Sequence, residues 1–141
     1  MYFDELEIGM KKEIPPAFIE KEEMLDFARK YDNIPLHTDE EYAKTTRFGK
    51  LIAPGMMSFL CVWAKYLEVD FFGDELIAGM STKVEWLRPV FPEDTIKADA
   101  EITNLTKKNE RSGVAEIVIN AYNENDEIVL KATTEALLRC R

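Results

Sequence analysis

The chain has 141 residues, of which 18 are Lys or Arg and 27 are Asp or Glu, so its formal net charge at pH 7 is −9. This length is typical of one domain, and a hydrophobic content of 46% excludes the class of disordered, weakly hydrophobic sequences. The acidic balance argues against a nucleic-acid partner, because neutralising phosphates requires a basic face. We therefore expect a single domain over residues 1–141.

The cysteines, the histidine and the N-terminus indicate the class of environment. Cys61 and Cys140 form no CxxC pair, and a single histidine does not make a metal ligand set, so we expect neither disulfides nor a metal site. The first residues are acidic, unlike a secretion signal, and the longest uncharged stretch, residues 51–64, is shorter than the ~18 residues that span a bilayer. The sequence predicts a soluble, cytoplasmic protein without membrane contact.

Helices are predicted for the first half of the chain. An extended N-terminal segment closed by Pro15-Pro16 precedes residues 21–31, whose apolar side chains follow the spacing of an amphipathic helix. A loop over residues 32–37 comes next. Thr38 and Glu41 then have the spacing of a capping box, which predicts a short helix over residues 39–45.

Residues 55–69 form a helical segment with almost no polar face. A helix that is apolar all round is a buried one, so in a chain this small the remaining residues must wrap it. The second half supplies the wrapping, since four segments alternate apolar and polar side chains with the period of a strand. These segments are residues 80–87, 96–102, 115–121 and 128–138, with polar turns over 107–113 and 123–126.

The predicted architecture is α+β, with one long central helix wrapped by an antiparallel sheet. Such a sheet leaves open edges, and pairing the edges across a twofold axis protects them. We therefore expect a homodimer or a dimer of dimers.

Asp32 and His37, the only histidine, lie five positions apart in the loop between the two predicted helices. A histidine with a carboxylate in reach is a general acid/base pair, in which the carboxylate orients the ring and stabilises its charged form. Such a pair holds one water molecule and exchanges its protons. The alternative interpretation is structural, with Asp32 ending a helix and His37 lying at the surface or next to the N-cap of the following helix.

Several motifs surround this pair. They are Tyr31-Asp32-Asn33-Ile34-Pro35-Leu36-His37, Arg47-Phe48-Gly49, Ile52-Ala53-Pro54-Gly55-Met56 and Arg88-Pro89-Val90-Phe91. Together they resemble the MaoC-like, (R)-specific enoyl-CoA hydratase family over about residues 1–138. The resemblance implies a hot-dog fold. It also implies that Asp32 and His37 activate water for syn addition to a trans-2-enoyl thioester, or for the reverse dehydration.

The resemblance further implies a substrate-binding role for the start of the central helix. The family places a glycine there, which is Gly55 in this chain, followed by Met56. N–H groups at a helix N-terminus carry partial positive charge and would hold the thioester oxygen as it becomes enolate-like. The alternative is that Gly55 simply begins the helix after Pro54.

The implied substrate is an acyl thioester of coenzyme A or of an acyl-carrier protein, and no further cofactor is expected. Coenzyme A carries phosphates, so a local basic patch must oppose the overall charge of −9. Lys44, Arg47 and Lys50 are the candidate phosphate contacts, because they lie close together between the motif loop and the central helix. The alternative is that all three are solvated surface charges.

Three positions depart from the family pattern. Tyr31, Ile34 and Pro54 stand where the family has glycine, asparagine and histidine. These departures keep two alternative functions open. One is a hot-dog acyl-CoA thioesterase, in which the same carboxylate aids attack of water on the carbonyl. The other is a catalytically silent dimer that binds acyl thioesters.

Overall fold

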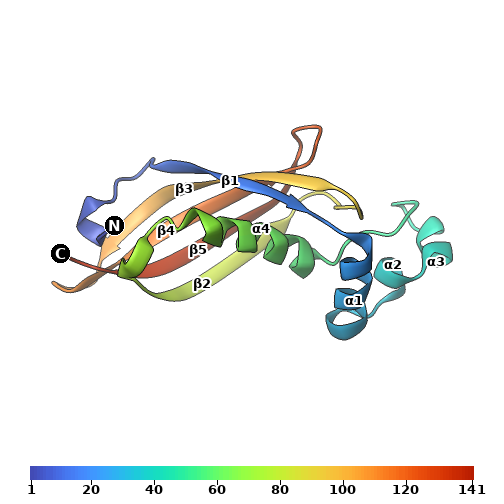
Figure 1. Ribbon diagram of the computed structural model, residues 1–141, viewed down its shortest axis with the longest axis horizontal. Helices are drawn as coiled ribbons and strands as arrows, with labels where there is room; N and C mark the ends of the chain where they lie inside the picture. The colour runs from blue at the N-terminus through green and yellow to red at the C-terminus, as the bar shows by residue number, and fades with distance from the viewer.

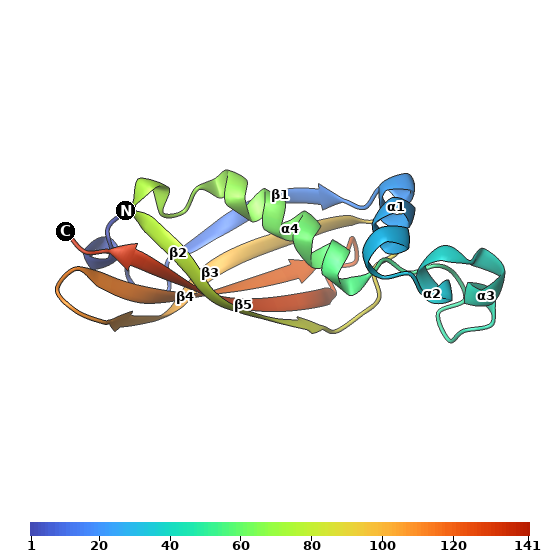
Figure 2. The ribbon, with the colours of Figure 1, turned by 90° about the horizontal axis from the view of Figure 1, so that it is seen from below.

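A five-stranded antiparallel sheet carries the long helix α4 along one of its faces (Figures 1 and 2). The computed structural model describes all residues, 1–141. The strand order is β1-β3-β4-β5-β2, so β1 and β2 are the two edges. The elements are η1 Phe3–Glu5, β1 Lys11–Phe18, α1 Lys21–Tyr31, α2 Pro35–Thr38, α3 Glu40–Lys44, α4 Gly55–Val69, η2 Gly73–Glu75, β2 Leu76–Trp86, β3 Thr95–Lys107, β4 Ser112–Tyr122 and β5 Ile128–Arg139.

The core lies between α4 and the inner face of the sheet. Alternate residues of β3, β4 and β5 are buried, as the period of a strand requires. Each large apolar side chain placed there contributes about 1.5–3 kcal/mol relative to exposure. The largest contributors from the helix and the strands are Met57, Phe59, Val62, Tyr66, Ile96, Ile102, Ile117, Ile119, Leu130 and Leu138. This packing confirms the predicted α+β architecture and the predicted helix over residues 55–69.

Helix α4 is not buried all round, which corrects the expectation from its composition. Met56, Leu60 and Leu67 are exposed, because the sheet covers only one side of the helix. Strand β2 is likewise open along most of its length, since only β5 pairs with it. A single chain thus exposes an apolar helix face and a free strand edge.

The first extended segment was predicted to end at Pro15-Pro16, and this prediction is wrong. Strand β1 continues through Pro15 and Pro16 to Phe18 and pairs with β3 on both sides of them. The register shifts between Ile14 and Ala17. An edge strand tolerates this because prolines, which lack an N–H, fit at edges and bulges.

The predicted capping box is also wrong. Thr38 is the last residue of α2, and its hydroxyl donates to the carbonyl of Ile34 at 3.2 Å. Asp39 caps α3 instead, with its carboxylate accepting from the N–H groups of Glu41 and Tyr42 at 3.0 and 3.1 Å. The physical reason is Pro35, which suits the first helical position and starts a separate turn that includes Thr38.

The short helices α1, α2 and α3 gather beyond one end of the sheet, where α4 begins (Figures 1 and 2). The two chain termini lie at the opposite end. None of the helices combines the length and apolar character needed to cross a membrane.

Candidate active site

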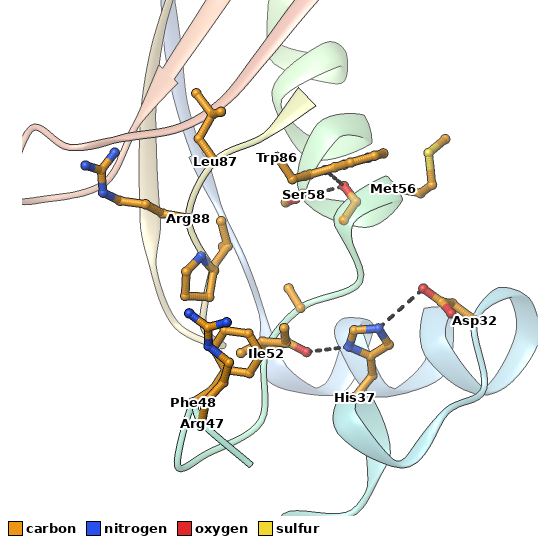
Figure 3. A pocket seen from close by; sticks show the side chains of 14 residues that line it. Asp32, His37, Arg47, Phe48, Ile52, Met56, Ser58, Trp86, Leu87 and Arg88 are labelled. Atoms are coloured by element: carbon orange, nitrogen blue, oxygen red, sulfur yellow. Dashed lines mark hydrogen bonds and ion pairs between the residues drawn. The ribbon is translucent and has the colours of Figure 1, made fainter. Parts of the chain in front are cut away.

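A cavity of about 540 Å³ lies where the start of α4, the end of β2 and the loops around α2 meet. It is lined by 14 residues, half of them hydrophobic. Asp32 and His37 line it together with Gly55 and Met56, so the structure brings the residues from two separate motifs to one place (Figure 3). The surface interpretation of His37 is wrong, since only 5% of the residue is exposed.

The local backbone fixes the positions of Asp32 and His37. Asp32 ends α1 as its C-cap, with its N–H donating to the carbonyl of Ala28. His37 lies in α2, and its N–H donates to the carbonyl of Ile34 at 3.0 Å. The tight turn between the two helices therefore sets the distance between Asp32 Oδ2 and His37 Nε2, which is 3.4 Å.

The orientation of the imidazole comes from Ile52 rather than from Asp32. His37 Nδ1 lies 2.8 Å from the carbonyl oxygen of Ile52. A carbonyl oxygen only accepts hydrogen bonds, so Nδ1 carries the proton and donates it. Ile52 was not identified from the sequence, because a backbone carbonyl leaves no signature in the residue type.

This tautomer leaves the Nε2 lone pair facing the Asp32 carboxylate. Two acceptors do not bond each other, and 3.4 Å exceeds the usual 2.7–3.2 Å of an N–H···O bond. A water molecule that donates one proton to each acceptor satisfies both. The Asp32 side chain is 38% exposed, against 7% for that of His37, so one partner of the pair reaches solvent.

The start of α4 presents unpaired backbone donors to the same cavity. The first helical bond runs from the Ser58 N–H to the carbonyl of Pro54, which leaves the first-turn N–H groups of Gly55 and Met56 without helical partners. Met56 is 49% exposed and lines the cavity next to Gly55. These groups form an anion-binding end of the kind that stabilises a developing oxyanion.

Two further residues hold the start of α4, and neither role was predicted from the sequence. Trp86 Nε1 donates to the carbonyl of Gly55 at 2.7 Å, and Ser58 Oγ donates to the same oxygen at 2.8 Å (Figure 3). Trp86 lies 31 positions from Gly55 in the sequence. No local pattern predicts such a contact.

The three candidate phosphate contacts separate into two groups. Arg47 lines the cavity of Asp32 and His37, forms no ion pair, and lies against the ring of Phe48. Lys44 and Lys50 line a second cavity of about 290 Å³. Lys44 already pairs with Glu41 at 2.9 Å, whereas Lys50 lies 4.1 Å above the ring of Phe91 without a carboxylate partner.

An ion pair between Lys21 and Glu40 also borders the second cavity and links α1 to α3. A hydrogen bond and charge attraction between the two groups raise the pKa of Lys21 and lower the pKa of Glu40. Both groups are solvated, so this pair positions the helices with little contribution to stability.

The departures from the family pattern at Tyr31 and Ile34 do not disturb the acid/base pair. Both side chains are exposed, and Tyr31 packs on Phe27 with ring centroids 5.1 Å apart. The backbone of Ile34 holds the turn by donating to the carbonyl of Asp32 and accepting from His37. Their side chains therefore leave the geometry of Asp32 and His37 intact.

A long helix lying along an antiparallel sheet of this strand order is the hot-dog fold, and its cavity brings Asp32 and His37 together with a helix N-terminus. The sequence model of the family described as MaoC like domain matches residues 5–124, and the chain belongs to this family. Its relatives include dehydratases and (R)-hydratases.

Three relatives match almost the whole chain. The structure of a monoamine oxidase regulatory protein from Archaeoglobus fulgidus is 37% identical, covers 100% of this chain and 95% of its own, and superposes with a TM-score of 0.94. The (R)-hydratase PhaJ1 from Pseudomonas aeruginosa is 25% identical with a TM-score of 0.73, covering 99% of this chain and 86% of its own. The uncharacterized protein YdeM of Bacillus subtilis is 26% identical over 99% of both chains.

Proposed function

We propose that the protein is a hydro-lyase that performs (R)-specific hydration of trans-2-enoyl thioesters, or the reverse dehydration of 3-hydroxyacyl thioesters. The observation that carries this proposal is the arrangement of His37 and Asp32. Nε2 and Oδ2 lie 3.4 Å apart in one cavity with the N-terminus of α4, while Nδ1 is held by Ile52.

The pair activates one water molecule. Nε2 of His37 accepts a proton from the water while the water oxygen bonds to C3 of the enoyl group. The carboxylate of Asp32 accepts a hydrogen bond from the same water and stabilises the imidazolium that forms. The π electrons shift toward C2 and the carbonyl, and C2 then takes the proton back from Nε2. Because one pair on one wall supplies both the oxygen and the proton, the addition is syn.

The N-terminus of α4 stabilises the charge that develops on the thioester oxygen. The N–H groups of Gly55 and Met56 are the donors, and loss of one such donor in other enzymes costs ~2.7–4 kcal/mol of transition-state stabilisation. The proposed steps move only one water molecule and one proton, and His37, Asp32 and the helix N-terminus account for both without a cofactor.

The acyl group is carried by coenzyme A or by an acyl-carrier protein. Arg47 is the first candidate for a phosphate of the carrier, since it lies at the cavity and has no carboxylate partner. Lys50 is the second, and Lys44 is the weakest because Glu41 already neutralises it.

The working unit is a homodimer, or a dimer of dimers built from it. Strand β2 offers a free edge with Leu76, Ile77 and Met80 exposed, and α4 exposes Leu60 and Leu67. A second copy that pairs along β2 protects the edge and removes apolar surface from water.

The decisive experiment uses crotonyl-CoA with two simultaneous readouts. Hydration lowers the ultraviolet absorbance of the enoyl group without releasing a thiol. Asp32→Asn and His37→Ala are each expected to abolish most turnover while circular dichroism shows an intact fold. Asp74→Asn, an exposed carboxylate in η2 at the other end of the sheet, is the matched control and should keep the wild-type rate.

The same assay separates the alternatives. Release of free thiol would assign the protein to the hot-dog thioesterases. A second candidate is a silent dimer that binds acyl thioesters, and the name of the Archaeoglobus relative, a regulatory protein, favours it. That candidate requires saturable acyl-CoA binding with no change in either readout.

A further inference from the structure

We infer that Trp86 and Ser58 are positioning residues for the substrate carbonyl, because together they hold and polarise the peptide group between Gly55 and Met56. This inference rests on the proposed function for the identity of the ligand. Its geometry stands on two hydrogen bonds that meet at one atom, the carbonyl oxygen of Gly55.

The contact of Trp86 with Gly55 is closer than any side chain at position 55 would allow. A Cβ on Gly55 would lie 2.7 Å from Cε2 and from Nε1 of the indole, well inside contact distance. Gly55 has ordinary helical geometry without a positive φ, so the backbone itself does not demand glycine. The requirement for glycine here comes from the indole of Trp86, which needs the space to reach the carbonyl.

Ser58 adds a second donor from within the helix. It is 1% exposed and lies among the apolar residues of α4, where alanine has the higher helix propensity. Its buried hydroxyl bonds back to the carbonyl of Gly55, one turn earlier. The hydroxyl of Ser58 therefore donates its hydrogen bond to the same carbonyl oxygen that accepts from Trp86.

Two donors on one carbonyl change the other end of the same peptide group. The oxygen belongs to Gly55, and the N–H of that peptide group belongs to Met56, one of the unpaired donors of the first turn. Hydrogen bonds to a carbonyl draw electron density toward its oxygen and make the N–H a stronger donor, by ~10–30% per bond. The two bonds also fix the plane of the peptide, so that the N–H need not reorient as the oxyanion forms.

Simple packing by Trp86 and polarisation by Trp86 predict different results for one substitution. Trp86→Phe keeps an aromatic ring against Gly55 but removes the Nε1–H donor. Packing alone would leave catalysis unchanged in this variant. Polarisation requires that kcat falls while KM, which reflects the remaining contacts with substrate, stays the same.

The experiment compares Trp86→Phe and Ser58→Ala with two matched controls. Trp63→Phe changes a tryptophan in the middle of α4 that packs on Phe59 and Tyr66, and Ser112→Ala changes a hydroxyl at the far end of the sheet that bonds to Asn109. Steady-state kinetics with crotonyl-CoA and the amide proton shift of Met56 in the free protein are measured for all four variants.

We expect kcat to fall about 5- to 10-fold in Trp86→Phe and in Ser58→Ala, with KM within about 2-fold of wild type. The Met56 amide proton moves upfield in both variants, and both controls behave as wild type. A Met56 amide that is unmoved in both variants, or a kcat equal to that of the controls, overturns the inference. A wild-type protein that hydrates no enoyl thioester refutes the proposed function instead, and the amide shift then decides whether the peptide is polarised.

Discussion

The imidazole of His37 donates its Nδ1–H to the backbone carbonyl of Ile52 at 2.8 Å, across 15 positions of the chain. This bond connects the turn of α2 to the segment that leads into α4, so His37 and the N-terminus of α4 are held in a fixed relative position. Because a carbonyl oxygen only accepts hydrogen bonds, the neutral ring keeps its proton on Nδ1.

Replacing Gly55 by alanine should lower both stability and activity. The new Cβ meets the indole of Trp86 and forces it away from the Gly55 carbonyl. We expect a loss of about 1–3 kcal/mol in the free energy of unfolding, as for other overpacked sites. Denaturant unfolding measures this loss. Gly79→Ala is the control, since no atom of this chain lies within 4 Å of the added Cβ and its cost should stay small.

Arg47→Gln should weaken binding of coenzyme A substrates specifically. Loss of a hydrogen bond from a charged donor predicts a KM about 10-fold higher with kcat unchanged. Lys44→Gln should change KM by less than about 3-fold, because Glu41 already pairs with that ammonium. A short acyl thioester that carries no phosphate distinguishes a contact of Arg47 with phosphate from any other contact that Arg47 makes. An equal loss with this thioester would show that Arg47 contacts something other than a phosphate.

Alkylation of Cys61 should be slow at neutral pH. Burial, with a smaller contribution from the charge of Glu23, raises the pKa of this thiol to about 11. A raised pKa keeps the reactive thiolate scarce below that pH, so the rate with iodoacetamide should rise about tenfold per pH unit as far as about pH 11. The measurement uses the Cys140→Ser background, in which Cys61 is the remaining thiol. A rate that levels off near pH 9 contradicts the expected burial.

Met80→Glu should dissociate the proposed dimer. Met80 is exposed on the free edge strand β2, and a charge at an edge opposes strand pairing. Light scattering should show at least two copies for the wild type and one for the variant. Asp99→Asn, on the inner strand β3, is expected to keep the wild-type mass. A monomeric wild type would refute the dimer outright.

Local periodicity explains which elements were predicted well. The helices over residues 21–31 and 55–69 match the structure to the residue, because the spacing that defines a helix lies within it. Strand β5 matches the predicted segment to within one residue, whereas the predictions for β2, β3 and β4 found the centres of the strands but not all of their ends. Strand β3 continues to Lys107, and β2 begins at Leu76, because pairing with β4 and β5 sets these limits.

The residues of the candidate site likewise include some that local sequence spacing reveals and others that it does not. The spacing of Asp32 and His37, together with the family resemblance, predicted both as residues of the site. The roles of Ile52, Ser58 and Trp86 depend on a backbone carbonyl or on contacts between distant segments. Such interactions exist only after folding and leave no spacing in the sequence to find.

The unequal exposure of Asp32 and His37 makes the carboxylate the member of the pair that is more open to the bulk solvent. The ring is enclosed, whereas part of the carboxylate is wet. In the proposed reaction, hydrogen taken up by the imidazole is expected to exchange with the surroundings by way of Asp32. In the dehydration direction in heavy water, a light hydrogen that passes from C2 to the ring and exchanges slowly would return to C2 when that step reverses, so the deuterium content of the recovered 3-hydroxyacyl thioester would record how long the enclosed ring keeps its hydrogen.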